Sequence, residues 1–137
     1  MTDLHCHILP AIDDGAKNAK VSMELLRMQN DAGITDIVCT PHFNPDSQNL
    51  EDFIDKRYRY ARYLADYVFC SELPVRLKFG AEVRISPTIL DLDFLPLCFQ
   101  KTKVMLLEMP RTLRPQWDTN VIYQLTLGGV IPLIAHI

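Results

Sequence analysis

Short apolar runs alternate along the chain with segments of helical period, and this alternation restricts the fold more than any other feature. Five runs are expected to be strands: residues 3–7, 36–40, 75–83, 104–108 and 130–136. Stretches with apolar residues three, four or seven apart are expected to be helices: residues 21–32, 51–69 and 117–127. Strands separated by helices predict βα units and a parallel sheet, so the expected fold class is α/β.

Glycine and proline set the expected boundaries. Gly33 stands where the first helix should stop, and Pro41 ends the second apolar run. Gly80 interrupts the third run, which predicts a bulge or a close approach of another segment. Residues 87–100 are apolar but broken by prolines, and the pattern assigns them no element.

Composition excludes several classes of partner. A chain of 137 residues with 48% hydrophobic and 23% charged residues is expected to form a single globular domain over residues 1–137. Its net charge of −3 gives no positively charged surface for nucleic acid. Residues 57–63, although rich in arginine and tyrosine, are therefore expected to line the surface of a helix. No apolar run approaches the roughly 18 residues of a membrane span, so no membrane insertion is expected.

The cysteines and the amino terminus predict a cytoplasmic location. The four cysteines contain no C-x-x-C pair, and residues 1–7 show no basic or apolar signal segment. Cys6 lies between two histidines and is expected to be buried and to point away from them, because neighbours on a strand face opposite sides. We therefore expect four reduced thiols.

The histidines and two glutamates are placed alike, at or just past the carboxyl ends of the expected strands, which form the functional face of parallel α/β folds. These six residues are His5, His7, His42, His136, Glu82 and Glu108. Carboxylates beside apolar runs are costly unless they are paired or bind metal. The pattern therefore favours a metal centre over a chance arrangement of solvated residues.

Imidazole and carboxylate donors without an obligatory thiolate suit manganese, iron or zinc. Six donors exceed the needs of one tetrahedral ion, and two ions bridged by a carboxylate can clamp a phosphoryl group. Asp13 and Asp14 could add a ligand. The alternative role for these aspartates is a helix-entry turn with an N-cap. For Asp13 this role and that of a metal ligand are equally favoured, whereas for Asp14 the metal ligand is favoured over the turn. No P-loop, G-x-G-x-x-G or G-x-S-x-G motif is present.

Six short motifs, taken together, resemble a known family. They are D-L-H-C-H-I-L-P from residue 3, D-D-G-A from residue 13, C-T-P-H from residue 39, G-A-E-V-R from residue 80, L-E at residues 107–108 and I-A-H at residues 134–136. Over residues 1–136 the chain resembles the PHP (polymerase and histidinol phosphatase) superfamily. Within it, the chain is most similar to the metal-dependent protein-tyrosine phosphatases of bacterial capsule synthesis.

The resemblance implies a distorted parallel (βα)7 barrel that carries a metal cluster, often manganese. The implied ligands are His5, His7 and Glu82 for a first ion, Glu82, Glu108 and His136 for a second, and Asp14 and His42 for a third. His42 and Asp14 are also expected to be catalytic. The implied reaction is hydrolysis of phosphotyrosine by a metal-activated hydroxide, on tyrosine kinases that control capsular or exopolysaccharide synthesis.

The sequence departs from this family after His136, where members continue with P-E-R and here Ile137 is the last residue. That arginine and a later Asp-x-His pair have no counterpart, and Arg84, Arg111 and Arg114 do not match the missing arginine. We therefore expect an incomplete barrel that forms the N-terminal part of the family domain. Its open apolar strand at residues 130–136 is expected to favour self-association.

Two alternatives to the phosphotyrosine phosphatase stay open. One is a truncated, non-catalytic remnant that binds metal or a partner. The other is a small-molecule phosphatase of the same superfamily, although D-D-G-A and G-A-E-V-R favour the tyrosine phosphatase branch. The sequence assigns no substrate-binding residue.

Overall fold

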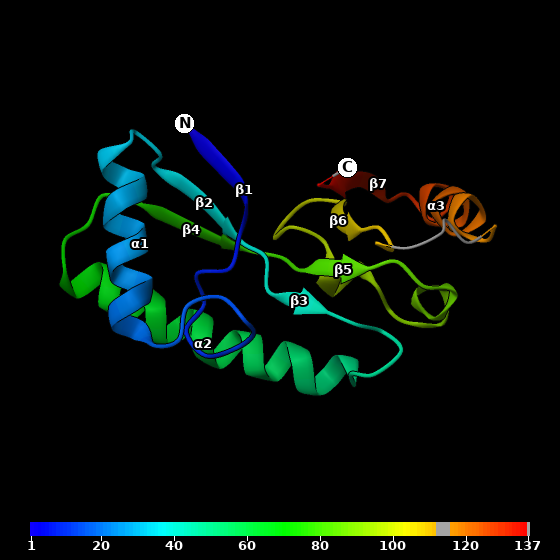
Figure 1. Ribbon diagram of the computed structural model, residues 1–137, viewed down its shortest axis with the longest axis horizontal. Coiled ribbons are helices and arrows are strands. Elements are labelled where there is room, and N and C mark those ends of the chain that lie inside the picture. Colours follow the sequence, from blue (N-terminus) through cyan, green and yellow to red (C-terminus); the bar gives the residue numbers. More distant parts are fainter. Residues whose placement is uncertain (112–115, 137) are drawn as a thin grey trace.

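The computed structural model describes residues 1–111 and 116–136, which form two small parallel sheets flanked by helices (Figure 1). The first sheet has the order β1-β2-β4, from Thr2–Cys6, Asp36–Cys39 and Arg76–Phe79. The second has the order β3-β5-β6-β7, from His42–Phe43, Glu82–Arg84, Val104–Glu108 and Ile131–Ala135. Every strand pair is parallel, which confirms the α/β class with parallel strands. The expectation of one sheet with five strands is wrong.

Two breaks in the backbone produce the second sheet. The chain leaves β2 at Cys39, passes Thr40 and Pro41, and enters β3, an element that the sequence did not predict. The predicted strand 75–83 is likewise two strands, β4 and β5, separated by Gly80 and Ala81. The chain therefore crosses from the first sheet to the second at both places.

The break at Gly80 has a steric reason. A Cβ atom at this position would lie 2.6 Å from Cδ1 of Phe99, so no larger residue fits without displacing the ring. The predicted close approach at Gly80 is thereby confirmed. The backbone N–H of Gly80 donates to the carbonyl of Cys39 at 2.9 Å, and that of Glu82 donates to the carbonyl of Pro41 at 3.0 Å. These bonds hold the two breaks side by side.

The helices lie close to their expected positions. They are α1 (Ala19–Asp31), α2 (Leu50–Cys70) and α3 (Asp118–Leu127). The side chain of Asn18 caps α1 and that of Asn49 caps α2, so neither Asp13 nor Asp14 serves as the cap of α1. Two short 3-10 helices, Pro87–Asp91 and Leu95–Leu97, occupy the region that the sequence left unassigned. No helix in the described ranges is long and apolar enough to cross a membrane.

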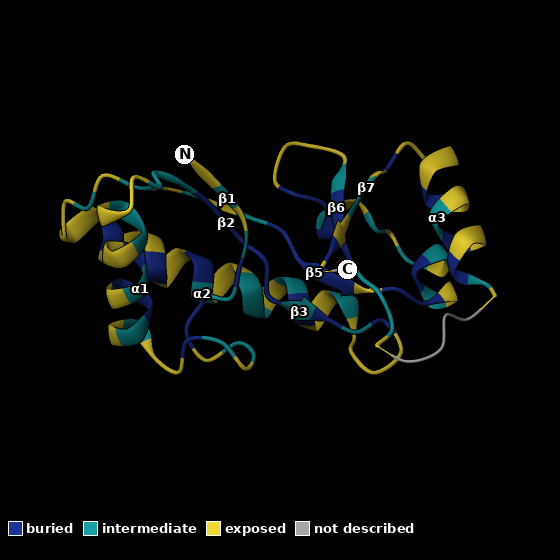
Figure 2. Ribbon diagram, turned by 45° about the horizontal axis from the view of Figure 1, so that its top comes forward, coloured by how far each residue is buried: buried dark blue, intermediate teal, exposed yellow. Residues whose placement is uncertain are grey.

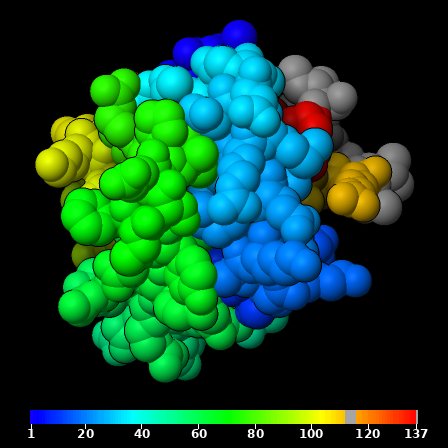
Figure 3. All heavy atoms as spheres, turned by 90° about the vertical axis from the view of Figure 1, so that its left-hand side faces the viewer, coloured from blue at the N-terminus to red at the C-terminus, as the bar shows by residue number. Residues whose placement is uncertain are grey.

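Each sheet has its own core, and helix α2 contributes to both. Helices α1 and α2 cover the first sheet and form the face shown in Figure 3, with Leu26 and Leu64 fully buried beneath them. On the second sheet, Phe53 of α2 packs on Phe43, with ring centroids 4.9 Å apart. A third cluster of Val38, Phe99, Leu106 and Ala135 joins the sheets. In Figure 2 each helix shows both buried and exposed colours, because only one of its faces turns to a core.

Arg57 links helix α2 to the break at Gly80. Its guanidinium donates from Nη1 to the carbonyl of Gly80 at 2.7 Å and from Nη2 to the carbonyl of Pro96 at 2.8 Å. Burial lowers the pKa of this guanidinium. The expectation that residues 57–63 line the helix surface is therefore wrong for Arg57, which turns inward and fixes the backbone two residues before Glu82.

We predict that Arg57→Met lowers the free energy of unfolding by about 1–3 kcal/mol, because two carbonyl groups lose their donors while the aliphatic volume is largely kept. The measurement is urea unfolding of both proteins. Arg62→Met, on an exposed position of the same helix, is the matched control and is expected to stay within about 0.5 kcal/mol. Equal losses in the two variants would contradict the assigned role of Arg57.

Candidate metal centre

The carboxylate of Glu82 lies at the centre of a ring of four imidazoles. Its side chain is 0% exposed, although a carboxylate is among the costliest groups to bury. Its Oε2 atom lies 2.9 Å from Nε2 of His5, 3.0 Å from Nε2 of His7 and 3.3 Å from Nδ1 of His42, and its Oε1 atom lies 2.9 Å from Nε2 of His136. All four histidines of the sequence therefore meet at one side chain.

The two backbone breaks bring this set together. His5 lies in β1, and His136 directly follows β7. His42 and Glu82 lie just past the carboxyl ends of β2 and β4, in line with the expectation, and each is also the first residue of the strand that follows a break. They are register partners between β3 and β5. The site thus lies where the first sheet passes into the second.

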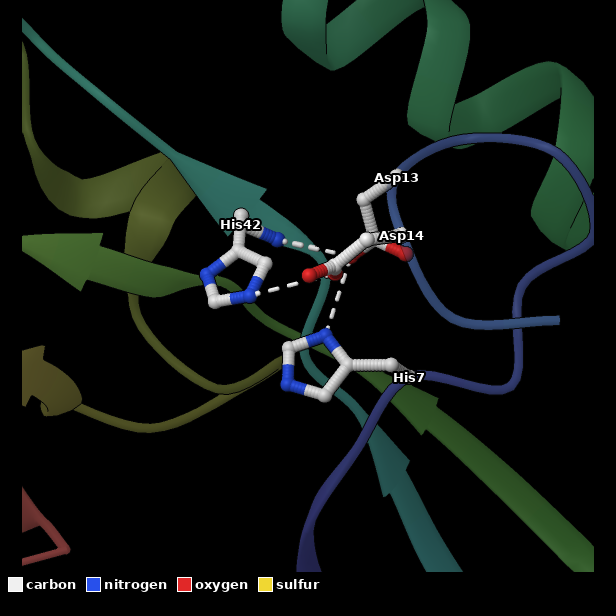
Figure 4. Close-up of side chains that lie close together, drawn as sticks. All are labelled: His7, Asp13, Asp14 and His42. Atoms are coloured by element: carbon white, nitrogen blue, oxygen red, sulfur yellow. Dashed lines mark hydrogen bonds and ion pairs between the residues drawn. The ribbon is translucent and has the colours of Figure 1, made fainter.

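Asp13 holds the ring of His7. Its Oδ2 atom lies 2.9 Å from Nδ1 of His7 and accepts the backbone N–H of His42 at 3.0 Å, while Oδ1 accepts the N–H of Gly15 at 2.9 Å (Figure 4). Burial alone would raise the pKa of Asp13, but these hydrogen bonds outweigh it and lower the pKa to about 2. Asp13 is therefore an ionised acceptor, which places the proton of His7 on Nδ1 and leaves Nε2 to face Glu82.

The contacts around Oε2 of Glu82 fit a bound cation. The Nε2 atoms of His5 and His7 are 3.2 Å apart, and both also lie within 3.0 Å of the same carboxylate oxygen. Neutral imidazoles that turn their lone pairs toward each other and toward an anion would repel. A proton can relieve one such contact at a time, whereas one divalent ion can relieve all three. The donor set therefore fits manganese, iron or zinc.

In the metal-free chain, Asp13 favours the protonated form of His7. The hydrogen bond to Asp13 raises the pKa of His7 more than burial lowers it. Burial alone would raise the pKa of Glu82, but the hydrogen bond and charge of His5, together with His42 and His136, outweigh it and lower the pKa. Because the pKa of His7 is raised, a proton on its Nε2 atom must leave before a metal ion can bind there.

Three overlapping groups of side chains could each hold an ion, with their donor atoms within 4.8 Å of one another. The groups are His5, His7 and Glu82; His42, Glu82 and Glu108; and His7, Asp13, Asp14 and His42. Glu82 belongs to two of them, as a bridging carboxylate would. Mixed groups of this kind are what a cluster of ions, rather than a single ion, requires.

The grouping differs in part from the ligand sets that the family resemblance implies. Glu108 lies beside His42, with 3.8 Å between its Oε2 atom and Nδ1 of the ring, rather than in a group with His136. His136 approaches the other oxygen of Glu82 and stacks on His5 with ring centroids 5.8 Å apart. The Oδ1 atom of the exposed Asp14 lies 3.4 Å from Nε2 of His42. The assignment of each residue to a particular ion stays a prediction.

From the sequence, Asp13 was predicted only as a metal ligand or a helix cap, and its contacts with His7 and His42 were not predicted. Its signal was the D-D-G turn itself, because a Cβ atom at Gly15 would overlap the carbonyl oxygen of His7. Only glycine lets this turn pack against the metal-site histidine. Cys6 is buried and donates from Sγ to the carbonyl of Val38 at 3.3 Å, which confirms that it points away from the site.

We predict that Glu82→Ala loses most of the bound transition metal, because two ions would lose a shared ligand. The measurement is the metal content of protein purified without chelator. Glu24→Ala, on the exposed face of α1, is the control and is expected to keep its metal. Unchanged metal content in Glu82→Ala would show that this carboxylate does not bridge.

Asp13→Ala is expected to weaken metal binding by about 10–100-fold, because the ring of His7 loses the acceptor that fixes its tautomer. The affinity can be measured by competition with a fluorescent chelator. Asp66→Ala, on an exposed position of α2, should bind metal like the parent protein. An affinity that Asp13→Ala leaves unchanged would rule out this positioning role.

Comparison with known proteins agrees with this geometry. Residues 1–137 match the model of a family described as capsular polysaccharide synthesis, CpsB/CapC. The tyrosine-protein phosphatase YwqE of Bacillus subtilis is 34% identical over 99% of this chain and 54% of its own length. The putative tyrosine-protein phosphatase CapC of Staphylococcus aureus is 30% identical over 99% of this chain and 53% of its own length.

A solved structure is similar as well. It belongs to a crystallographic study of YwqE from Bacillus subtilis and CpsB from Streptococcus pneumoniae, described there as unique metal-dependent tyrosine phosphatases. It matches with a TM-score of 0.85 and 34% identity, over 99% of this chain and 55% of that one. The chain thus spans about half the length of the curated relatives that it matches.

Proposed function

The chain belongs to the CpsB/CapC family of capsular polysaccharide synthesis, and we propose that it acts in a metal-dependent phosphatase that hydrolyses phosphotyrosine on proteins. The observation that carries this proposal is the convergence of four imidazoles on the buried carboxylate of Glu82. Such a centre concentrates positive charge, once loaded, at a point where a phosphate ester can be held. YwqE, CapC and CpsB carry the name tyrosine-protein phosphatase, which supports the choice of substrate.

A divalent ion bound here would supply charge for the phosphoryl oxygens and would lower the pKa of water. We propose manganese as that ion, with iron or zinc as alternatives. The proposed ligands are His5, His7, Asp14, His42, Glu82, Glu108 and His136. Asp13 fixes the proton of His7 at Nδ1, so that Nε2 is free to ligate.

His42 and Asp14 are the proposed catalytic pair. The ring of His42 faces Glu82 with Nδ1 and Asp14 with Nε2, so it links the buried carboxylate to the surface. The Asp14 side chain is 82% exposed and is placed to orient water or to exchange a proton with solvent. Tyrosine, with an ordinary pKa of about 10, is a good leaving group, so a weak acid at this position suffices.

The target and the assembly are further parts of the proposal. We propose that the substrates are tyrosine kinases that control polysaccharide synthesis, in the cytoplasm. The two open sheets would be the N-terminal part of a distorted (βα)7 barrel. Edge strand β7 exposes Ile131 and Ile134, by 60% and 36%, which supports self-association along this edge.

Turnover of a phosphotyrosine peptide tests the proposed function. Activity is expected to need added manganese, to disappear with chelator and to fall strongly in His42→Ala. It should also rise as the pH increases above about 6.5, the ordinary pKa of histidine, because the pKa of His7 is raised and its proton must leave before metal binds. Lys56→Ala, on helix α2, is a control that should behave like the parent protein.

Three outcomes would count against this proposal. Preference for a sugar or amino-alcohol phosphate over phosphotyrosine would indicate a small-molecule phosphatase. Stoichiometric metal without any turnover would indicate a non-catalytic metal-binding protein. Turnover that chelator leaves unchanged would remove the metal from the mechanism.

A further inference from the structure

Arg84 lies on the same side of the second sheet as the metal centre. Residues two apart on a strand share a face, so Arg84 shares the face of Glu82 in β5. In the register between β5 and β6, Arg84 pairs directly with Glu108. The backbone positions of Arg84 and Glu82 are therefore about 7 Å apart along the strand, the spacing of successive residues on one face.

A cavity of about 310 Å³ opens at this point, lined by Arg84, Glu108, Met109, Pro110 and Arg111. Its volume is at the lower end of the range of about 300–1,000 Å³ that is usual for small-ligand pockets. Glu108 is also a member of the group that it forms with His42 and Glu82. The cavity thus adjoins the candidate metal centre through a shared wall.

The two arginines of this cavity have no fixed anionic partner. In the described part of the chain, neither Arg84 nor Arg111 forms an ion pair, and both are exposed. The charge of Arg84 does contribute to the lowered pKa of Asp46, but hydrogen bonds from Ser86 and Thr88 are the larger causes. Those hydroxyls occupy Oδ1 of Asp46 at 2.6 and 2.7 Å.

The cavity therefore carries two positive charges against the single carboxylate of Glu108. If Glu108 binds a metal ion, its charge is compensated by that ion, and the guanidinium groups remain for a ligand from solution. Guanidinium groups match phosphate oxygens in a bidentate geometry. Met109 and Pro110 add an apolar wall that suits an aromatic ring.

We propose that Arg84 and Arg111 bind the phosphoryl oxygens of the substrate, and that Met109 and Pro110 contact the ring of its phosphotyrosine. This inference rests on the proposed function and assigns its substrate pocket. The metal centre and the arginine pair would then hold the phosphoryl group from two sides. The cavity, of about 310 Å³, has room for an aryl phosphate.

The test is calorimetric binding of benzylphosphonate, a non-hydrolysable aryl phosphonate, to the manganese-loaded chain. Arg84→Gln and Arg111→Gln are each expected to weaken this binding about tenfold, with unchanged manganese content and melting temperature. The affinity of Arg84→Lys for benzylphosphonate should lie between those of the parent and Arg84→Gln, because lysine keeps the positive charge but loses the bidentate geometry of the guanidinium. Methylphosphonate, which has no ring, should bind more weakly than benzylphosphonate.

Arg62→Gln, on the exposed face of helix α2, is the control and should bind like the parent. Unchanged benzylphosphonate affinity in both arginine variants would overturn the inference. Absence of benzylphosphonate binding to the parent chain would overturn it too. Phosphotyrosine turnover with unaffected phosphonate binding in the variants would reject this pocket and leave the proposed function intact. If phosphonate binding depends on the arginines but phosphotyrosine is not hydrolysed, the pocket is supported and the proposed function is rejected.

Discussion

The burial of the Glu82 carboxylate is the constraint on which the rest of the structure depends. An ionised carboxylate with no exposed surface is tolerated only where positive charge or hydrogen-bond donors surround it. Here the four imidazoles fill that role, and they come from three parts of the chain: His5 and His7 at β1, His42 in β3 and His136 after β7. The same arrangement gives a set of side chains that could hold divalent cations.

The fold meets this constraint by breaking two strands rather than by extending one sheet. Had β4 continued through Gly80, Glu82 would have remained in the first sheet. The close contact of Gly80 with Phe99 and the bonds from Arg57 instead turn the chain, so that Glu82 pairs with His42 in the second sheet. Packing between distant segments, with helix α2 contributing through Arg57, thus determines where the carboxylate of Glu82 lies.

The polar groups around the metal centre divide into two kinds. On one side, Asp13 and the D-D-G turn fix the orientation of His7 through contacts that leave no freedom at Gly15. On the other side, Arg84 and Arg111 remain without fixed partners among the described residues and border a cavity. A rigid side that could hold ions and an open side that can receive an anion fit the proposed phosphoester-binding site.

The sequence by itself determined the α/β class, the three helices, the family and the set of histidines and glutamates at the site. These follow from local period, from turn residues and from short motifs, all of which are readable within a few neighbouring positions. Strand register, backbone breaks and the direction of long side chains depend on packing between distant segments. Only the tertiary structure therefore decided that one sheet becomes two, that Asp13 orients His7, that Arg57 turns inward and that Glu108 lies beside His42. Residues as far apart as His5 and Glu82, 77 positions from each other, share a contact that no local pattern encodes.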